Sequence, residues 1–409
     1  MSAIADSAKS DKTIPIAESV QTNSHRLMSL DVFRGVTIAA MMLVNNAGDW
    51  KNIYEPLEHA KWHGWTFTDT VFPFFLWIVG VAIPLSLGRR LEQNENRSQL
   101  VSKILRRAVI LFALGLFLNA FTYFYNGFFS PKHEGFAFWM KDMAAHLRYP
   151  GVLQRIGICY LCASLIFLST TIRGQAVWIG ALLAGYWAMM NWIPVPGFGA
   201  GILELRGNFS EFVDTIIFQG HVFRESTTYD PEGIISTIPA IATVLFGIMA
   251  GHLLRSKKSV EEKTVWLLVG GNILLFAGEI MNFWLPINKR IWTSSYSVFM
   301  AGLAMNVFAV YYWFIDVKSH RTWAKPFAIY GMNAITVFVL SGILGRLSLE
   351  IKMTGTSGEK IPLKVFLYDH FFAHLASPKN SSLLWAISYV LLLYLAAYFM
   401  YRRKWFIKF

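Results

Sequence analysis

The sequence predicts an all-α protein that crosses a membrane about ten times. Hydrophobic residues make up 55% of the chain and charged residues only 15%, and the mean hydropathy is +0.42. A soluble domain carries about 25% charged residues. Apolar runs of about 20 residues, long enough for a helix to cross the hydrocarbon core, recur along the whole chain. We therefore expect a disordered cytosolic tail over 1–26 and a single transmembrane domain over 27–409.

Each expected span is an apolar run that begins or ends at polar or turn-forming residues. The first closes at Asn45, the second begins beside Asp69, and the fourth follows Pro150. Before the sixth, the sequence DPEG predicts a helix with Asp230 as its N-cap and Pro231 as its first residue. The ten spans are expected near 30–48, 68–88, 104–126, 151–172, 175–193, 236–254, 264–284, 291–315, 326–346 and 383–401.

The basic residues indicate how the chain is oriented. A formal net charge of +12 could point to a nucleic acid, but the positive charges gather in connections that we place in the cytosol. They are densest over 88–107 and 402–404. Both ends of the chain are then cytosolic, and no nucleic-acid partner is expected. The loop that carries His59 lies on the extracytoplasmic side.

The stretch 57–80, LEHAKWHGWTFTDTVFPFFLWIVG, is the most informative part of the chain. It places His59 in an aromatic-rich loop ahead of Asp69. Histidine exchanges a proton near neutral pH because its ordinary pKa is about 6.5, and a nearby carboxylate could orient the ring. Trp62 and Trp65 offer flat faces of the kind that line sugar or cofactor sites. The simpler alternative is an interfacial histidine that bonds to headgroups, with Asp69 acting only as a helix cap.

Further polar groups stand inside or at the edge of the spans. Gln154 and Arg155 enter the fourth span, where an arginine is costly unless it faces protein or water. Asp31 and Arg34 lie three residues apart at the start of the first span. A salt bridge on one helix face is the simpler interpretation of this pair. Binding of a cytosolic anion by Arg34 is the alternative.

Several motifs with a known chemistry do not occur in the sequence. There is no GxSxG, HExxH, Walker or GxGxxG motif, so hydrolase, zinc-peptidase, P-loop ATPase and dinucleotide-binding functions lose their usual support. Cys159 and Cys162 are one helix turn apart, but no further ligands accompany them. We therefore expect small packing residues and no metal.

Six motifs occur in the order that one membrane family has, and they span 26–409. On these motifs the chain resembles the transmembrane acyltransferases typified by heparan-α-glucosaminide N-acetyltransferase, and in particular the shorter bacterial members of the NagX type. The motifs are RLMSLDVFRGVTIAAMMLVNNAGDW, EHAKWHGWTFTDTVFPFFLWIVG, YPGVLQRIGICY, DPEGIISTIPAIATVLFGIMAG, INKRIWTSSYSVFMAG and YGMNAITVF.

The resemblance implies acetyl transfer across the membrane, from cytosolic acetyl-CoA to the amine of an extracytoplasmic aminosugar of the glucosamine type. It also implies that His59 is catalytic, that Asn45 is functional, and that the protein lies in a bacterial cytoplasmic (inner) membrane. A neutral His59 could take the proton of the amine, with Asn45 or Asp69 assisting. Alternatively, His59 could carry the acetyl group itself.

Two further sets of residues are predicted to bind the substrates. The hydrocarbon core is about 30 Å thick, so we expect a cytosol-facing vestibule that admits the pantetheine arm of acetyl-CoA. The residues expected to hold the CoA phosphates are Arg34, Arg89, Arg90, Arg106 and Arg107. Those expected to contact the aminosugar are Glu58, Trp62, Gln154, Arg155, Asp230 and Glu232.

A secondary transporter for an aminosugar or amino-sugar oligosaccharide is the competing hypothesis. It explains the spans, the intramembrane polar groups and the aromatic residues equally well, but not the histidine of an external loop among six family motifs. Dependence on acetyl-CoA separates the two functions. Besides the substrates, the partners considered are membrane lipids and a second copy of the chain in a homodimer.

Overall fold

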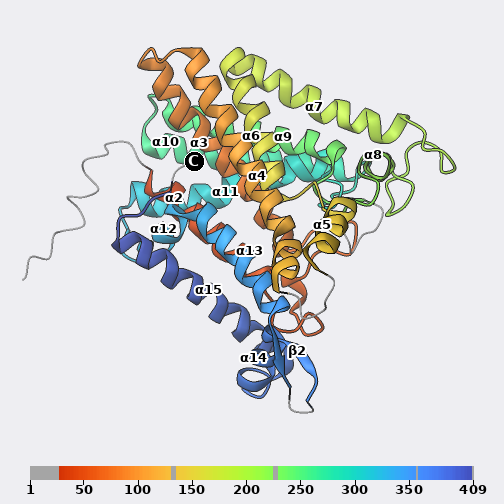
Figure 1. Cartoon of the computed structure of the whole chain (residues 1–409). Coiled ribbons are helices and arrows are strands. Elements are labelled where there is room, and N and C mark those ends of the chain that lie inside the picture. Colours follow the sequence, from red (N-terminus) through yellow and green to blue (C-terminus); the bar gives the residue numbers. More distant parts are fainter. Residues whose placement is uncertain (1–26, 130–134, 224–228, 356–357, 408–409) are drawn as a thin grey trace, which may run out of the picture.

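The chain folds into a bundle of long helices, with shorter elements gathered mainly at one end (Figure 1). The structure is a computed structural model that describes residues 27–129, 135–223, 229–355 and 358–407. The tail expected over 1–26 lies outside the described residues. The helices are α2 (Met28–Val44), α3 (Phe67–Glu92), α4 (Arg97–Phe129), α5 (Gly135–His146), α6 (Val152–Ser169), α7 (Ile172–Trp192), α8 (Phe209–Phe218), α9 (Ile234–Arg255), α10 (Val260–Asn282), α11 (Ser294–Tyr312), α12 (Lys325–Met332), α13 (Ala334–Glu350), α14 (Leu363–Phe371) and α15 (Pro378–Arg402).

Several short elements lie beside or between the long helices. A 3₁₀ turn (Glu55–Leu57) precedes the His59 segment, and a π-helical turn (Trp313–Val317) ends α11. Strands β1 (Lys352–Thr354) and β2 (Lys360–Pro362) form an antiparallel hairpin between α13 and α14. In Figure 1 this hairpin and α14 project together below the bundle.

The helices confirm the predicted fold class. Seven of them are long and apolar enough to cross a membrane, or eight if α12 and α13 form one broken span. The remaining expected spans fall on α2, which has 17 residues, and on α7; both are helices outside that set. The protein is therefore an all-α polytopic membrane protein, while the number of ten spans stays a prediction.

Two features differ from the sequence prediction. The span expected over 326–346 consists of two helices, because the chain bends by 76° between α12 and α13. At the bend, the Asn333 amide donates to the carbonyl of Trp405 (3.1 Å) and accepts from the N–H of Ile407 (3.3 Å), so this side chain bonds away from the helix axis. The expected basic loop over 88–107 is mostly helical, because α3 runs to Glu92 and α4 begins at Arg97.

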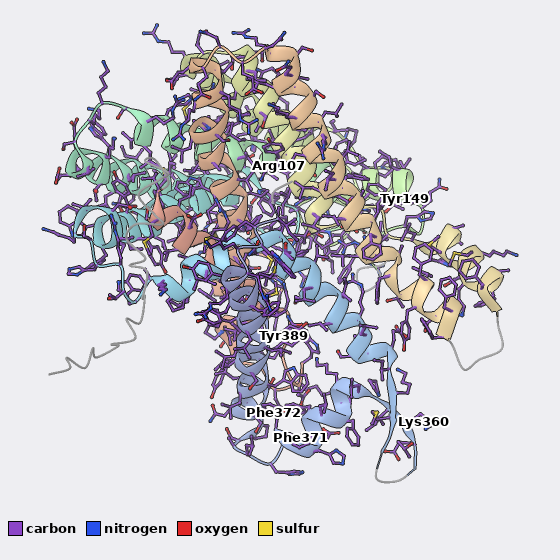
Figure 2. All side chains as sticks on the ribbon, turned by 60° about the vertical axis from the view of Figure 1, so that its left-hand side comes forward. Arg107, Tyr149, Lys360, Phe371, Phe372 and Tyr389 are labelled. Atoms are coloured by element: carbon purple, nitrogen blue, oxygen red, sulfur yellow. The ribbon has the colours of Figure 1, made fainter. Side chains whose placement is uncertain are left out.

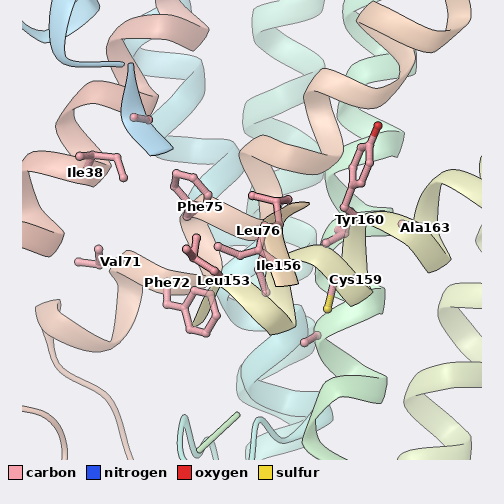
Figure 3. Close-up of a cluster of buried hydrophobic side chains, with 14 of the residues drawn as sticks. Ile38, Val71, Phe72, Phe75, Leu76, Leu153, Ile156, Cys159, Tyr160 and Ala163 are labelled. Carbon is pink, nitrogen blue, oxygen red and sulfur yellow. The ribbon is translucent and has the colours of Figure 1, made fainter. Parts of the chain in front are cut away.

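The core of the bundle is built around α3. In its most apolar stretch 78% of the residues are buried, as expected for a helix that is hydrophobic on all sides. Figure 3 shows Phe72 and Leu76 of α3 in one cluster with Leu153, Ile156 and Cys159 of α6. Cys159 is thus a packing residue, as the sequence predicts.

Two glycines bring α3 and α9 close together. Gly80 faces the carbonyl of Val244, and Gly247 faces the carbonyl of Trp77, so a Cβ atom at either position would overlap the backbone of the other helix. Small residues permit this kind of close approach between membrane helices. Both helices begin at the same end of the bundle, and this end carries the candidate site.

The two ends of the bundle carry different side chains. Helix α3 has 26 residues and is therefore about 39 Å long, which places Asp69 in its first turn and Arg89 in its last turn at opposite ends. In Figure 2, Arg107 lies in the upper part of the bundle, and Lys360 of the hairpin lies at the lower right. The His59 loop and most of the predicted basic rim are thus separated by the length of the bundle.

Candidate active site

His59 and Asp69 form a close pair at the start of α3. The Nδ1 atom of His59 lies 2.6 Å from Oδ1 of Asp69, whose side chain is only 1% exposed. An ionised carboxylate can only accept, so Nδ1 carries a hydrogen and donates it. The other ring nitrogen, Nε2, is then the unprotonated one in the neutral ring. Asp69 thereby fixes both the orientation and the tautomer of His59.

Local folding explains why Asp69 stands where it does. Thr66 is the N-cap of α3 and forms a capping box with Asp69, whose Oδ2 accepts from the N–H of Thr66 (3.0 Å). The same oxygen accepts from the N–H of Ala60 (3.0 Å). The sequence left open whether Asp69 caps the helix or partners His59. Its carboxylate does both.

The connection between α10 and α11 packs against the His59 loop. The N–H of Gly64 donates to the carbonyl of Ile287 (2.7 Å), and Gly64 pairs with Asn288 in a short β-bridge. From α11, the hydroxyl of Tyr296 donates to the backbone carbonyl of Asp69 (2.5 Å). Lys289 follows Asn288, so this packing brings its positive charge within the electrostatic range of His59 and Asp69.

The surroundings keep His59 in its neutral form. Although 39% of its side chain is exposed, loss of solvent around the ring is the largest influence, and it lowers the pKa of His59 below its usual value of 6.5. The charges of Lys289 and Arg290 lower this pKa further, whereas Asp69 opposes the change. A histidine that is neutral at physiological pH can accept a proton.

Lys289 is a cation without a direct partner. In the part of the chain that the structure describes, its ammonium makes no hydrogen bond or ion pair. Burial lowers the pKa of Lys289, and the carboxylates of Glu232 and Asp69 oppose this change from a distance. An unneutralised cation beside a neutral base is suited to hold negative charge that develops on a substrate.

Asp230 and Glu232 hold Arg148 rather than project freely from the loop. The Arg148 guanidinium binds Asp230 through Nε (2.7 Å) and Nη2 (2.6 Å), and Nη2 also contacts Glu232. These two carboxylates raise the pKa of Arg148 despite its burial. The predicted N-cap is wrong: α9 begins at Ile234 after a turn over 230–233, because Asp230 uses its carboxylate for Arg148 and for the N–H of Glu232 (2.9 Å).

Arg155 faces protein, as an arginine in a span must. It is 1% exposed; its Nη2 donates to the carbonyl of Gly233 (3.1 Å) and to the hydroxyl of Ser236, and its guanidinium stacks on Trp292. It therefore joins α6 to the start of α9. This position makes Arg155 a support for the Asp230–Glu232 turn and not a group that the structure exposes to an aminosugar.

Trp62 and Glu58, two further residues predicted to contact the sugar, lie in the His59 loop. Trp62 is half-buried, and its indole N–H donates to the carbonyl of Leu203 (2.9 Å), so only part of the ring is open. Glu58 is exposed, and its carbonyl accepts from the hydroxyl of Thr66.

Asn45 and Gln154 line a cavity of about 360 Å³ at the His59 end of the bundle, together with Arg148. The cavity wall does not include His59. Within the described residues no hydrogen bond joins Asn45 to His59, and the contact that orients the ring comes from Asp69 instead. The structure thus brings His59 and Asp69 together and places Asn45 and Gln154 in a neighbouring space.

The residues predicted to hold the CoA phosphates do not meet in this cavity. Arg34 forms the expected ion pair with Asp31 (3.2 Å). Arg89 and Arg90 lie in the last turn of α3, whereas Arg107 lies in α4 over the ring of Tyr160. The fifth of them, Arg106, is exposed on α4. A phosphate-binding role for this basic end stays a prediction.

The fold and the site define a polytopic helical membrane protein with a histidine–aspartate pair at one end. Residues 26–286 match the family model described as heparan-alpha-glucosaminide N-acetyltransferase, catalytic, and the chain belongs to this family. It is 29% identical over 365 residues to the Homo sapiens heparan-alpha-glucosaminide N-acetyltransferase, covering 77% of this chain and 52% of the relative. For the Mus musculus protein of the same name the values are 27% over 373 residues, 79% and 54%. The chain thus spans about half the length of these curated relatives.

Sequence reasoning missed Lys289 and Tyr296 as members of the site. Both lie in the INKRIWTSSY motif, which contributed to the resemblance but was given no role of its own. Lysines in connections were interpreted only as a topology signal. The signal that could have pointed to Lys289 is its place in a short connection that we assign to the extracytoplasmic side, where positive charges are fewer.

Proposed function

We propose that this protein is a transmembrane N-acetyltransferase that moves an acetyl group from cytosolic acetyl-CoA to the amine of an extracytoplasmic, glucosamine-type sugar. The observation that carries this proposal is the 2.6 Å contact between His59 and the buried Asp69. Membership in the N-acetyltransferase family supports the reaction class. A bacterial cytoplasmic membrane, with the His59 loop outside, is part of the same proposal.

The site residues have defined tasks in this reaction. The amine nitrogen attacks the thioester carbonyl carbon while its proton passes to Nε2 of His59, and the C–S bond then breaks. The thiolate of CoA leaves and takes the proton back from His59. Asp69 stabilises the imidazolium that forms in between, and Lys289 attracts the negative charge on the carbonyl oxygen. Asn45 holds a substrate group in the adjoining cavity.

Acetyl transfer by the purified protein tests the proposal. Labelled acetyl-CoA is incubated with a panel of aminosugars and with wild-type protein, His59→Ala or His63→Ala. His63 is the matched control because it lies in the same loop but contacts Glu204 and Asn288 instead of Asp69. We expect His59→Ala to lose a factor of about 10² to 10⁴ in rate and His63→Ala to stay near wild type. Wild-type rates in His59→Ala would refute the assignment.

The same assay separates direct transfer from an acetyl-histidine route. Without a sugar, a covalent route leaves labelled acetyl on wild-type protein but none on His59→Ala. We favour direct transfer because an acetyl group on an exposed imidazole is open to hydrolysis. A transporter, by contrast, would move the sugar unmodified and would not respond to acetyl-CoA.

A further inference from the structure

A cavity of about 360 Å³ lies at the His59 end of the bundle. It lies between the end of α2, the start of α6 and the segment from α13 to α15. The segment that joins α2 to α3 supplies Asn45 and Trp50 to the cavity wall. The same segment carries His59 further along, outside that wall. The cavity and the histidine therefore share one connection at one end of the bundle.

Two cations in this cavity form no ion pair with any carboxylate in the described part of the chain. Arg346 of α13 donates through Nη1 to the carbonyl of Gly342 in its own helix (3.1 Å), and Lys364 of α14 lies over the ring of Trp50. Neither side chain lies within ion-pair distance of a carboxylate in 27–129, 135–223, 229–355 or 358–407. Asp49 acts on Lys364 only from a longer distance. Both cations are half-buried, and an unpaired charge that has lost part of its solvent is costly.

A third cation, Arg148, differs because it is already neutralised. Its two carboxylate partners, Asp230 and Glu232, lie in the turn that precedes α9. The excess positive charge of the cavity therefore belongs to Arg346 and Lys364. The neutral amides of Asn45 and Gln154 line the same space and can complete the hydrogen bonding of a bound group.

We propose that this cavity binds an anionic group, a phosphate, sulfate or carboxylate, with Arg346 and Lys364 as its charged ligands. The proposal rests on the proposed function, since the group belongs to a substrate. The cavity lies at the His59 end, so an acidic substituent on the sugar is the expected source, and the nucleotide part of acetyl-CoA is the other outcome of the test. The volume is at the lower end of the usual range for small-molecule sites and suits a fragment of this size. Arginine and lysine both bind such groups through charge-assisted hydrogen bonds.

Substrate pairs that differ by one anionic group test the proposal. Acetyl-CoA is compared with acetyl-pantetheine, and glucosamine 6-phosphate with glucosamine, in wild-type protein and in an Arg346→Gln, Lys364→Gln double variant. Lys360→Gln is the matched control, since Lys360 is an exposed lysine of the neighbouring β2 strand. We expect wild type to prefer the anionic member of one pair by about 10- to 100-fold in kcat/KM, and the double variant to lose that preference.

Each outcome has a defined meaning. If the double variant loses the preference only in the acetyl-CoA pair, the cavity binds the nucleotide phosphates. If it loses the preference only in the sugar pair, the cavity binds an acidic acceptor. Preferences that survive in the double variant, or that wild type never shows, overturn the proposal. Arg346→Lys, which keeps the charge, should retain most of the preference and so separates charge from packing.

A binding measurement makes the result independent of catalysis. Sodium sulfate should raise the Tm of wild-type protein more than that of the double variant, each compared with sodium chloride of equal ionic strength, because only wild type adds specific binding to the general effect of sulfate. If no variant transfers acetyl but sulfate still stabilises wild type more than the double variant, the anion site stands and the proposed function fails. Equal sulfate effects on wild type and the double variant reject the site.

Discussion

Thr66 and Asp69 form the capping box that begins α3, and the carboxylate of Asp69 also holds the ring of His59. One side chain thus starts a transmembrane helix and orients the candidate base. Thr66 can be used to separate the two roles: its hydroxyl bonds to Asp69 (3.1 Å) and to the carbonyl of Glu58 (2.5 Å), and no hydrogen bond joins it to His59 within the described residues.

Asp69→Asn should abolish most activity while the fold persists. An asparagine can present its amide to Nδ1, which places the ring hydrogen on Nε2 and removes the base. We expect a loss in kcat of about 10² to 10⁴. Thr66→Ala is the control; it should cost about 1 kcal/mol of stability and leave kcat near wild type. Equal losses of kcat in both variants would assign Asp69 to the helix cap alone.

Lys289→Met should move the pH profile of acetyl transfer. The rate rises with pH as His59 loses its proton, and the Lys289 cation is one reason why the pKa of His59 is low. Removing this cation raises that pKa, so the acidic limb of the kcat/KM profile moves to higher pH, and the maximal rate falls with the lost charge stabilisation. Lys61→Met, at an exposed lysine of the same loop, should leave the limb in place. An unmoved limb in Lys289→Met would contradict the electrostatic role.

Asp214 should make the protein more stable at acidic than at neutral pH. Burial raises the pKa of Asp214 from 3.8 to about 7, although its carboxylate accepts from the N–H groups of Asp230 and Ile234 (3.2 Å each). Because the pKa in the folded state exceeds that in the unfolded state, this contribution is full below about pH 4 and is lost as the pH rises to about 7. Asp214→Asn should flatten the change in Tm between pH 5 and pH 8. An unchanged difference in Tm in Asp214→Asn would show that the carboxylate is ionised throughout this pH range.

Sidedness can be checked by labelling single cysteines in intact cells, in a background without Cys159 and Cys162. We expect an impermeant reagent to label a cysteine at Trp62 and not at Arg97 or Lys258, which lie at the other end of the bundle. The reverse pattern would place the His59 loop in the cytosol, and with it the proposed acceptor side.

Much of the fold could be predicted because membrane spans leave a strong signal in composition. The break at Asn333 could not be predicted: the side chain there bonds to Trp405 and Ile407, which lie 72 and 74 residues further along the chain. By contrast, the His59–Asp69 pair could be predicted from the sequence, because the two residues lie close together in the chain, in one loop and the helix cap that follows it. Lys289 could not, because a fold that packs the α10–α11 connection onto that loop is needed to bring it there.

The glycine contacts between α3 and α9 set how the two helices that lead to the site pack together. Gly80 and Gly247 let the two backbones touch, and pulling them apart would leave a gap that no side chain can fill. The helices that carry Asp69 and the Glu232 turn therefore meet backbone to backbone, and a larger residue at either glycine would force them apart. Neither α3 nor α9 contributes to the cavity wall, which α13, α14 and α15 complete on the far side. The close contact that sets the spacing of α3 and α9 is thus separate from the walls of the cavity.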